Sequence, residues 1–94
     1  DDVPYGLGIL KNKSDIYFGE FKNRFPEGEC YQKEGSNEYY GSFRKGLKEG
    51  KIQAWFENGS SFIGIYSNDN MKDGTLLQKD KTSYTGPFKN NLPY

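Results

Sequence analysis

The sequence predicts an all-β fold, built as an elongated, curved, single-sheet stack of antiparallel β-hairpins. Three observations lead to this prediction. Only 33% of the 94 residues are hydrophobic, yet 17% are aromatic, a balance that favours strands over helices. Twelve glycines are spread along the chain, where they disfavour helices and permit tight turns. The third observation is an internal repeat, which indicates an array of similar structural units.

The repeat has the pattern aromatic, any residue, Gly, any residue, aromatic, and each copy that is followed far enough has a second glycine nine or ten residues after the first. Its leading aromatic residues stand at 17, 39, 62 and 84, so the spacings are 22, 23 and 22 residues. We expect full units at 17–38, 39–61 and 62–83, preceded by a second half-unit at 1–16 and followed by a first half-unit at 84–94. Because both ends fall inside the pattern, we expect the chain to be a fragment of a longer array. The residues that define the repeat are Tyr17, Gly19, Phe21, Gly28, Tyr39, Gly41, Phe43, Gly50, Phe62, Gly64, Tyr66, Gly74, Tyr84, Gly86 and Phe88.

Each unit is expected to form one hairpin. Alternation along its first strand places the aromatic, Gly and aromatic residues on one face, where the glycine leaves room for a ring from a neighbouring strand and lets the backbone bend. Polar turns follow at 22–24, 44–46, 67–70 and 89–91. The second strands are expected to begin at Gly28, Gly50 and Gly74, and to end in return turns at 34–35, 58–59 and 79–81. One hairpin buries a face poorly, so the units should depend on their neighbours for stability.

The composition excludes several kinds of chemistry. Thirteen basic and 13 acidic residues cancel, which argues against a nucleic-acid-binding domain. The chain has no histidine, so Ser/His/Asp catalysis and His-ligated zinc sites are impossible. The single cysteine, Cys30, indicates a reducing compartment, and its repeat position, shared with Gly8, Ile52 and Leu76, predicts a packed thiol rather than a nucleophile. We therefore expect no catalytic activity, no cofactor and no metal site.

The repeat resembles the MORN repeat (membrane occupation and recognition nexus), whose pattern is Tyr-x-Gly-x-Trp-x-x-Gly-x-x-x-Gly-x-Gly. The first unit departs from it at Arg24, where the family prefers glycine, and Phe or Tyr replaces the Trp throughout. The resemblance implies a non-catalytic scaffold in the cytoplasm, at the cytoskeleton or at the inner face of the plasma membrane. It also implies a module that dimerises, binds partner proteins or phosphoinositides, or forms a regulatory appendage of an enzyme such as a phosphatidylinositol phosphate kinase or a SET-domain methyltransferase. The best-matching unit is the second, through Tyr39, Gly41, Phe43, Gly46, Gly50 and Gly59.

A protein partner, or a second copy of the chain, is the first expected ligand. Alternation places large apolar residues on the face opposite the repeat aromatics, where they should form an exposed ladder of the kind found at interaction surfaces. The alternative is that this ladder packs on neighbouring hairpins or on a segment outside the chain. The outermost strands, near 6–11 and 84–89, could also form a homodimer by pairing their free edges. The candidate partner-binding residues are Phe18, Tyr40, Ile63, Ile65 and Trp55.

An anionic membrane surface is the second expected ligand. Basic residues occupy the turns after the first strands, so stacking should align them along one edge of the sheet. Acidic residues recur a few positions later, at Glu27, Glu49 and Asp73, and partly neutralise this edge. The alternative is an ordinary solvated turn surface. The candidate lipid-binding residues are Lys22, Arg24, Arg44, Lys45 and Lys89.

Overall fold

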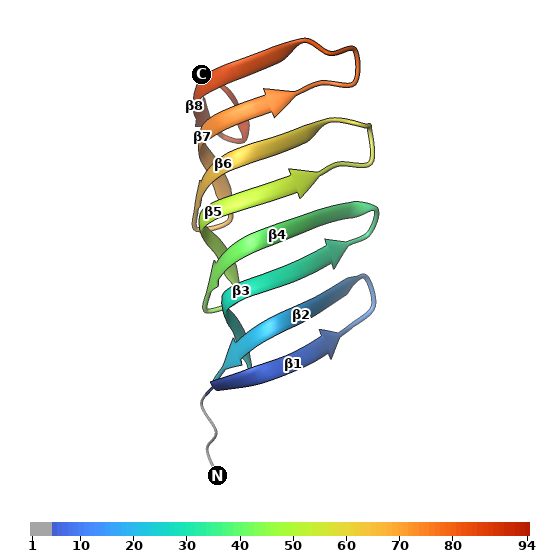
Figure 1. The fold of residues 1–94 in the computed structure, drawn as a ribbon, viewed down its shortest axis with the longest axis vertical. Helices are drawn as coiled ribbons and strands as arrows, with labels where there is room; N and C mark the ends of the chain where they lie inside the picture. The colour runs from blue at the N-terminus through green and yellow to red at the C-terminus, as the bar shows by residue number, and fades with distance from the viewer. Residues whose placement is uncertain (1–4) are drawn as a thin grey trace.

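The protein forms one open, nine-stranded sheet in which every strand pairs, antiparallel, with the strands next to it in sequence (Figure 1). A computed structural model describes residues 5–94. The described part is elongated, measuring 49 × 23 × 17 Å, and its two ends lie at opposite ends of the long axis. The all-β fold and the stack of hairpins are thus confirmed. The strands are β1 (Tyr5–Lys11), β2 (Asp15–Lys22), β3 (Phe25–Glu34), β4 (Asn37–Arg44), β5 (Leu47–Trp55), β6 (Ser61–Ser67), β7 (Asn70–Leu77), β8 (Ser83–Lys89) and β9 (Leu92–Pro93).

The turns inside the units are tighter than the sequence suggested. Each contains two successive residues with positive φ, such as 53° and 73° at Asn23 and Arg24, which is the conformation that matches the twist of a hairpin. The prediction that the second strands begin at Gly28, Gly50 and Gly74 is therefore wrong. They begin three or four residues earlier, directly after the turns, at Phe25, Leu47 and Asn70.

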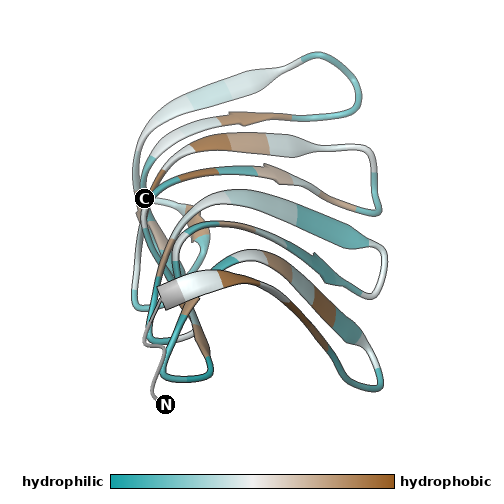
Figure 2. Ribbon diagram, turned by 60° about the horizontal axis from the view of Figure 1, so that its bottom comes forward, coloured by the Kyte–Doolittle hydropathy of each residue, from teal (hydrophilic) through white to brown (hydrophobic). Residues whose placement is uncertain are grey.

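The strands bend near their centres, as Figures 1 and 2 show, and the bend follows a glycine-rich row of residues that crosses the sheet. Irregular pairing directly after this row, for example between Gly41 and Phe43, accommodates the bend. Gly41 has φ +148°, and a Cβ there would collide with the carbonyl oxygen of Lys51 on β5. Neighbouring backbone, rather than the expected ring, fills this gap. A ring lies beside the row at Gly8, where the nearest atoms to an added Cβ belong to Phe21, but Gly8 does not stand between two aromatic residues. The row runs through Gly8, Gly19, Cys30, Gly41, Ile52, Gly64, Gly74 and Gly86.

One assignment within this row was wrong. The sequence placed Leu76 in the position of Cys30 and Ile52, but the pairing puts Gly74 there, opposite both Gly64 and Gly86. Gly74 lies ten residues after Gly64, whereas Ile52 lies eleven after Gly41, so the third hairpin reaches the row one residue sooner. Leu76 consequently pairs with Phe62, in the position that Ala54 holds in the preceding hairpin.

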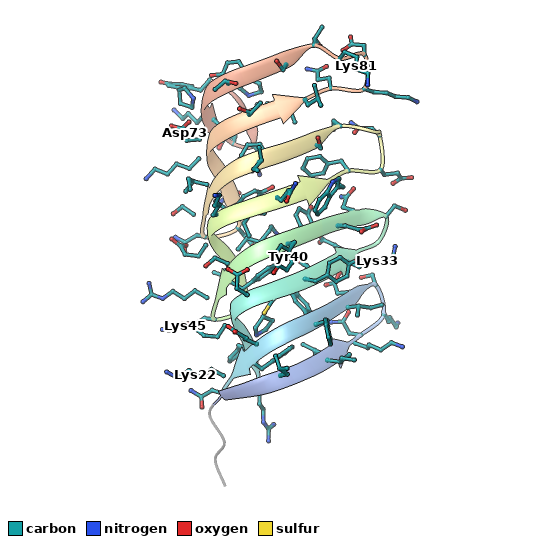
Figure 3. The ribbon with its side chains drawn as sticks, viewed as in Figure 1. Lys22, Lys33, Tyr40, Lys45, Asp73 and Lys81 are labelled. Carbon is teal, nitrogen blue, oxygen red and sulfur yellow. The ribbon has the colours of Figure 1, made fainter. Side chains whose placement is uncertain are left out.

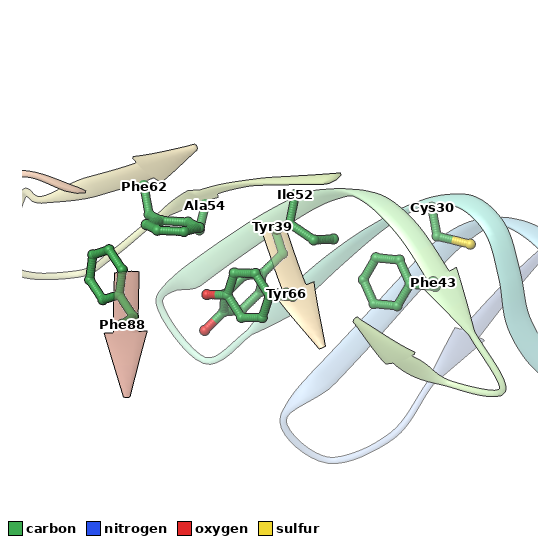
Figure 4. Close-up of a cluster of buried hydrophobic side chains, with 8 residues drawn as sticks. All are labelled: Cys30, Tyr39, Phe43, Ile52, Ala54, Phe62, Tyr66 and Phe88. Carbon is green, nitrogen blue, oxygen red and sulfur yellow. The ribbon is translucent and has the colours of Figure 1, made fainter. Parts of the chain in front are cut away.

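The core lies beneath the arch of the bent strands, on what we call the inner face (Figure 4). The rings of the repeat meet there edge to face, a favourable arrangement for aromatic pairs. Phe62 lies 5.5 Å from Tyr66 and 5.3 Å from Phe88 between ring centroids, so the contact joins consecutive units. The buried apolar residues are Cys30, Tyr39, Phe43, Ile52, Ala54, Phe62, Tyr66 and Phe88.

Hydrogen bonds also join each unit to the turn of the next one. Glu27 accepts one from the backbone N–H of Lys45 at 2.9 Å, and Glu49 accepts one from Asn68 at 2.8 Å. These recurring acidic residues therefore hold the turn of the following unit, which is more than the local turn chemistry that their position suggests. The described residues contain no helix, and hence none long and apolar enough to cross a membrane.

A second set of hydrogen bonds joins consecutive units, each from a backbone N–H of a second strand to a side chain in the turn of the next unit. The backbone N–H of Lys48 donates to Asp69 at 2.8 Å, and that of Met71 donates to Asn91 at 2.7 Å. In the first joint the corresponding strand residue is Pro26, which has no N–H, and the turn residue is Gly46, which has no side chain. The side chain of the turn thus supplies an acceptor in the two joints where the strand offers a donor.

Candidate functional site

A ladder of side chains crosses the outer face of the sheet, opposite the core. The pairing places each member directly beside the next, so the row is continuous through eight strands, and the expected residues of the first strands alternate in it with residues of the second strands. Phe18 is 53% exposed, and Tyr40 and Ile63 are each 48% exposed. These three side chains are therefore open to solvent in the described chain and are not packed on other hairpins. The ladder consists of Ile9, Phe18, Tyr31, Tyr40, Gln53, Ile63, Thr75 and Thr85.

Further apolar residues flank the ladder on the same face. Ile65 and Trp55, both predicted, are exposed on either side of it. Sequence reasoning did not include the flanking residues Leu7 and Leu77, nor Ile9 of the ladder itself, although all three are exposed. Ile9 could have been found by extending the ladder to β1, whose pairing with β2 puts Ile9 opposite Phe18.

Two depressions flank Tyr40 on the outer face. One, of about 160 Å³, includes Glu29, Lys51 and Ile63 in its lining. The other, of about 480 Å³, is lined by Tyr31, Glu38, Tyr40 and Trp55, and we call it the aromatic depression. Tyr40 lies near the centre of the face in Figure 3.

Carboxylates lie beside both tyrosines of this region. Desolvation and the carboxylate of Glu38 raise the pKa of Tyr31. The negative charge of Glu29 is the main cause that raises the pKa of Tyr40. A phenol of ordinary pKa is already protonated at neutral pH, so both side chains are hydrogen-bond donors beside acidic groups.

The inner face contains a groove of about 670 Å³, which sequence reasoning missed. Lys48, for which the sequence analysis made no prediction, lies in it with a side chain only 8% exposed. Its Nζ pairs with Asp69 at 3.2 Å and lies 4.2 Å from the ring centroid of Tyr39. The signal was present in the repeat, since Lys48 stands where the other units have Pro26 and Met71. A buried cation is thus already paired with a carboxylate and an aromatic ring.

The predicted basic edge exists, and it is mixed in sign. Lys22 and Lys45 project from the same edge as Asp73, while Lys33 and Lys81 lie at the opposite edge (Figure 3). The turns that hold Arg24 and Lys45 and the strand ends at Arg44 and Lys89 belong to the first edge. Lys89 also lies over the ring of Tyr94, 5.4 Å from its centroid. Glu27 and Glu49 hold turn amides at this edge, so their negative charge stays beside the cations.

Cys30 lies in the core. Its side chain is 1% exposed, and its Sγ donates to the carbonyl oxygen of Glu20 at 3.0 Å. Burial raises the pKa of the thiol, so the reactive thiolate is disfavoured. In the part of the chain that the structure describes, no three Cys, Asp or Glu side chains are grouped so that they could hold a metal ion.

The fold and these surfaces define an all-β protein of consecutive antiparallel hairpins in a single open sheet. No family model matches the chain. No curated protein matches it either.

Proposed function

We propose that the chain is a non-catalytic interaction module of the MORN-repeat type, which binds a partner protein or a second copy of itself through the outer face. The observation that carries the proposal is the continuous ladder, in which Phe18, Tyr40 and Ile63 are exposed. A sheet with one covered face normally presents polar residues on the other. Large apolar residues in one row instead give a partner a desolvated centre of contact.

The ladder also supports a rigid mode of docking. Its members belong to paired strands, so their spacing is fixed by the sheet rather than by loops. Tyr and Trp are common anchors of protein interfaces because they offer a large contact area with few rotatable bonds. Tyr40 and Trp55 lie on adjacent strands of this face.

The test uses a double variant, Tyr40→Ser with Ile63→Ser. We expect it to lose the proteins that the unaltered chain captures by cross-linking in a cell extract, and to lose any self-association seen by sedimentation, while its circular dichroism stays unchanged. Gln53→Ser is the matched control, since Gln53 lies in the same row between Tyr40 and Ile63 but is polar. Unfolding of the double variant would mean that the ladder is part of the core.

A groove variant locates the interface. Glu57 is exposed and lines the inner groove, so Glu57→Arg should obstruct the groove without disturbing the outer face. We expect captured partners to bind this variant normally. If the partners still bind the double variant but no longer bind Glu57→Arg, the interface lies on the inner face and the proposal is contradicted.

Binding to anionic lipid is the second candidate, and the projection of Lys22 and Lys45 from one edge favours it. Each cation near an anionic leaflet contributes about 1 kcal/mol, but nearby carboxylates oppose this attraction. Flotation with vesicles that contain phosphatidylinositol bisphosphate tests it at low and high salt. Salt-sensitive binding that is lost in Lys22→Glu with Lys45→Glu, and kept in the ladder double variant, would favour the membrane over the protein partner.

A further inference from the structure

The aromatic depression has a composition unlike the rest of the ladder. Three aromatic residues and one carboxylate line it, and they come from three consecutive strands, β3, β4 and β5. Tyr31 lies directly opposite Tyr40, and Glu38 lies directly opposite Trp55. Side chains that face each other across paired strands have Cβ atoms about 5 Å apart, so the four groups surround one small volume.

The faces of aromatic rings carry negative potential and attract cations, and Trp attracts them most strongly. The carboxylate of Glu38 adds a full negative charge beside these rings. The neighbouring Tyr31 is a neutral phenol, and burial and this carboxylate raise its pKa further above the ordinary value. The depression therefore combines an aromatic wall with a single acidic group.

The lysine nearest to Glu38 in the pairing is directed elsewhere. Lys33 lies opposite Glu38, but its Nζ donates to the carbonyl oxygen of Gly35 at 3.2 Å, in the turn between β3 and β4. The smaller depression on the other side of Tyr40 differs, because Lys51 lines it together with Glu29. Its acidic group thus has a cation of this chain beside it, whereas the aromatic depression includes no lysine or arginine in its lining.

Any partner that covers Tyr40 and Trp55 also removes water from Glu38. A buried carboxylate without a partner of opposite charge is strongly destabilising. An apolar partner would impose this cost on the complex, whereas a cationic side chain would compensate the charge and stack on the rings. We propose that the aromatic depression receives an arginine or lysine side chain of the partner protein. This inference rests on the proposed function, whose partner it describes by its chemistry.

The experiment uses Trp55, the only tryptophan of the chain, as a reporter inside the site. Acetyl-arginine-amide is titrated against the labelled protein, and the Trp55 indole N–H signal is followed by NMR. Acetyl-citrulline-amide has nearly the same shape without the charge and serves as the matched probe. We expect saturable shifts with the arginine probe and binding about 5-fold weaker with citrulline.

Variants assign the effect to the depression. Glu38→Gln should weaken the arginine probe about 5-fold and leave citrulline unchanged, while Glu57→Gln, in the inner groove, should change neither. Equal affinities for both probes, no shift of the Trp55 signal, or an equal loss in both variants would each overturn the inference. A captured partner that binds Glu38→Gln normally, yet is lost in the Tyr40→Ser and Ile63→Ser variant, would overturn it while leaving the proposed function intact.

Discussion

Replacing Gly41 by alanine should destabilise the sheet strongly, because the strand bends there against its neighbour. The added Cβ would collide with the carbonyl oxygen of Lys51 and lie 3.0 Å from the Cα of Ile52, both on β5. In addition, φ of +148° is rarely adopted by residues with a side chain. Such a conformation costs about 1–3 kcal/mol, and displacing the backbone of β5 adds to it. We expect the free energy of unfolding to fall by about 3 kcal/mol.

Urea unfolding followed by circular dichroism and Trp55 fluorescence measures this loss. Gly8→Ala is the matched control, since Gly8 belongs to the same glycine-rich row, but the nearest atom that a Cβ there would meet is in the ring of Phe21, at 3.4 Å. We expect this control to change the stability by less than about 0.5 kcal/mol. If Gly41→Ala were as stable as Gly8→Ala, the close approach of β4 and β5 at the bend would be refuted.

Three further predictions concern the turns, the buried lysine and pH. Arg24→Gly should raise the free energy of unfolding by about 0.5–1 kcal/mol, because Arg24 has φ +73°. Asn23→Gly should gain nothing, because asparagine adopts positive φ at little cost, and equal gains from the two variants would refute the argument. Asp69→Asn removes the charge beside buried Lys48, so it should lower the free energy of unfolding in urea by about 1–2 kcal/mol. In a Lys48→Met background the same change should be nearly neutral, and a full loss of stability there would contradict the pairing. Burial, then Tyr39 and Asp69, raise the pKa of Tyr66 above its ordinary value of 10.0. The folded state therefore keeps a proton that the unfolded state releases, so the free energy of unfolding should fall from about pH 10 upward. In a thermal-melting series over this range, the dependence of the free energy of unfolding on pH should be about 1.4 kcal/mol per pH unit shallower for Tyr66→Phe. An unchanged slope would contradict this reasoning.

The sequence allowed the architecture to be predicted because every unit carries the same local signals. Alternating rings and glycines in one phase specify strands, one covered face and a bend, and the structure confirms each of them. The exposed ladder followed from the same alternation, since Phe18, Tyr40 and Ile63 each stand one residue from a core position.

The strand starts and the partners of polar groups could not be predicted in the same way. Arg24 and Asp69 adopt positive φ without being glycine, so the two-residue turns were not visible in the composition. Nothing in its own unit marks Lys48 for burial, and the next unit supplies Asp69 as its partner. Contacts of this kind depend on how two units stack, and the single unit carries no direct signal of them.

The pairing of each strand with its sequence neighbours alone has a consequence for biosynthesis. A hairpin that emerges from the ribosome finds its docking edge already formed by the segment made just before it. No strand has to wait for a distant part of the chain. In sheets of more complex connectivity, such a wait slows folding and leaves unpaired, aggregation-prone strand edges exposed. The same order means that a unit inserted between two hairpins replaces one junction by two and leaves all other pairings unchanged, so arrays of this type can change length by simple duplication.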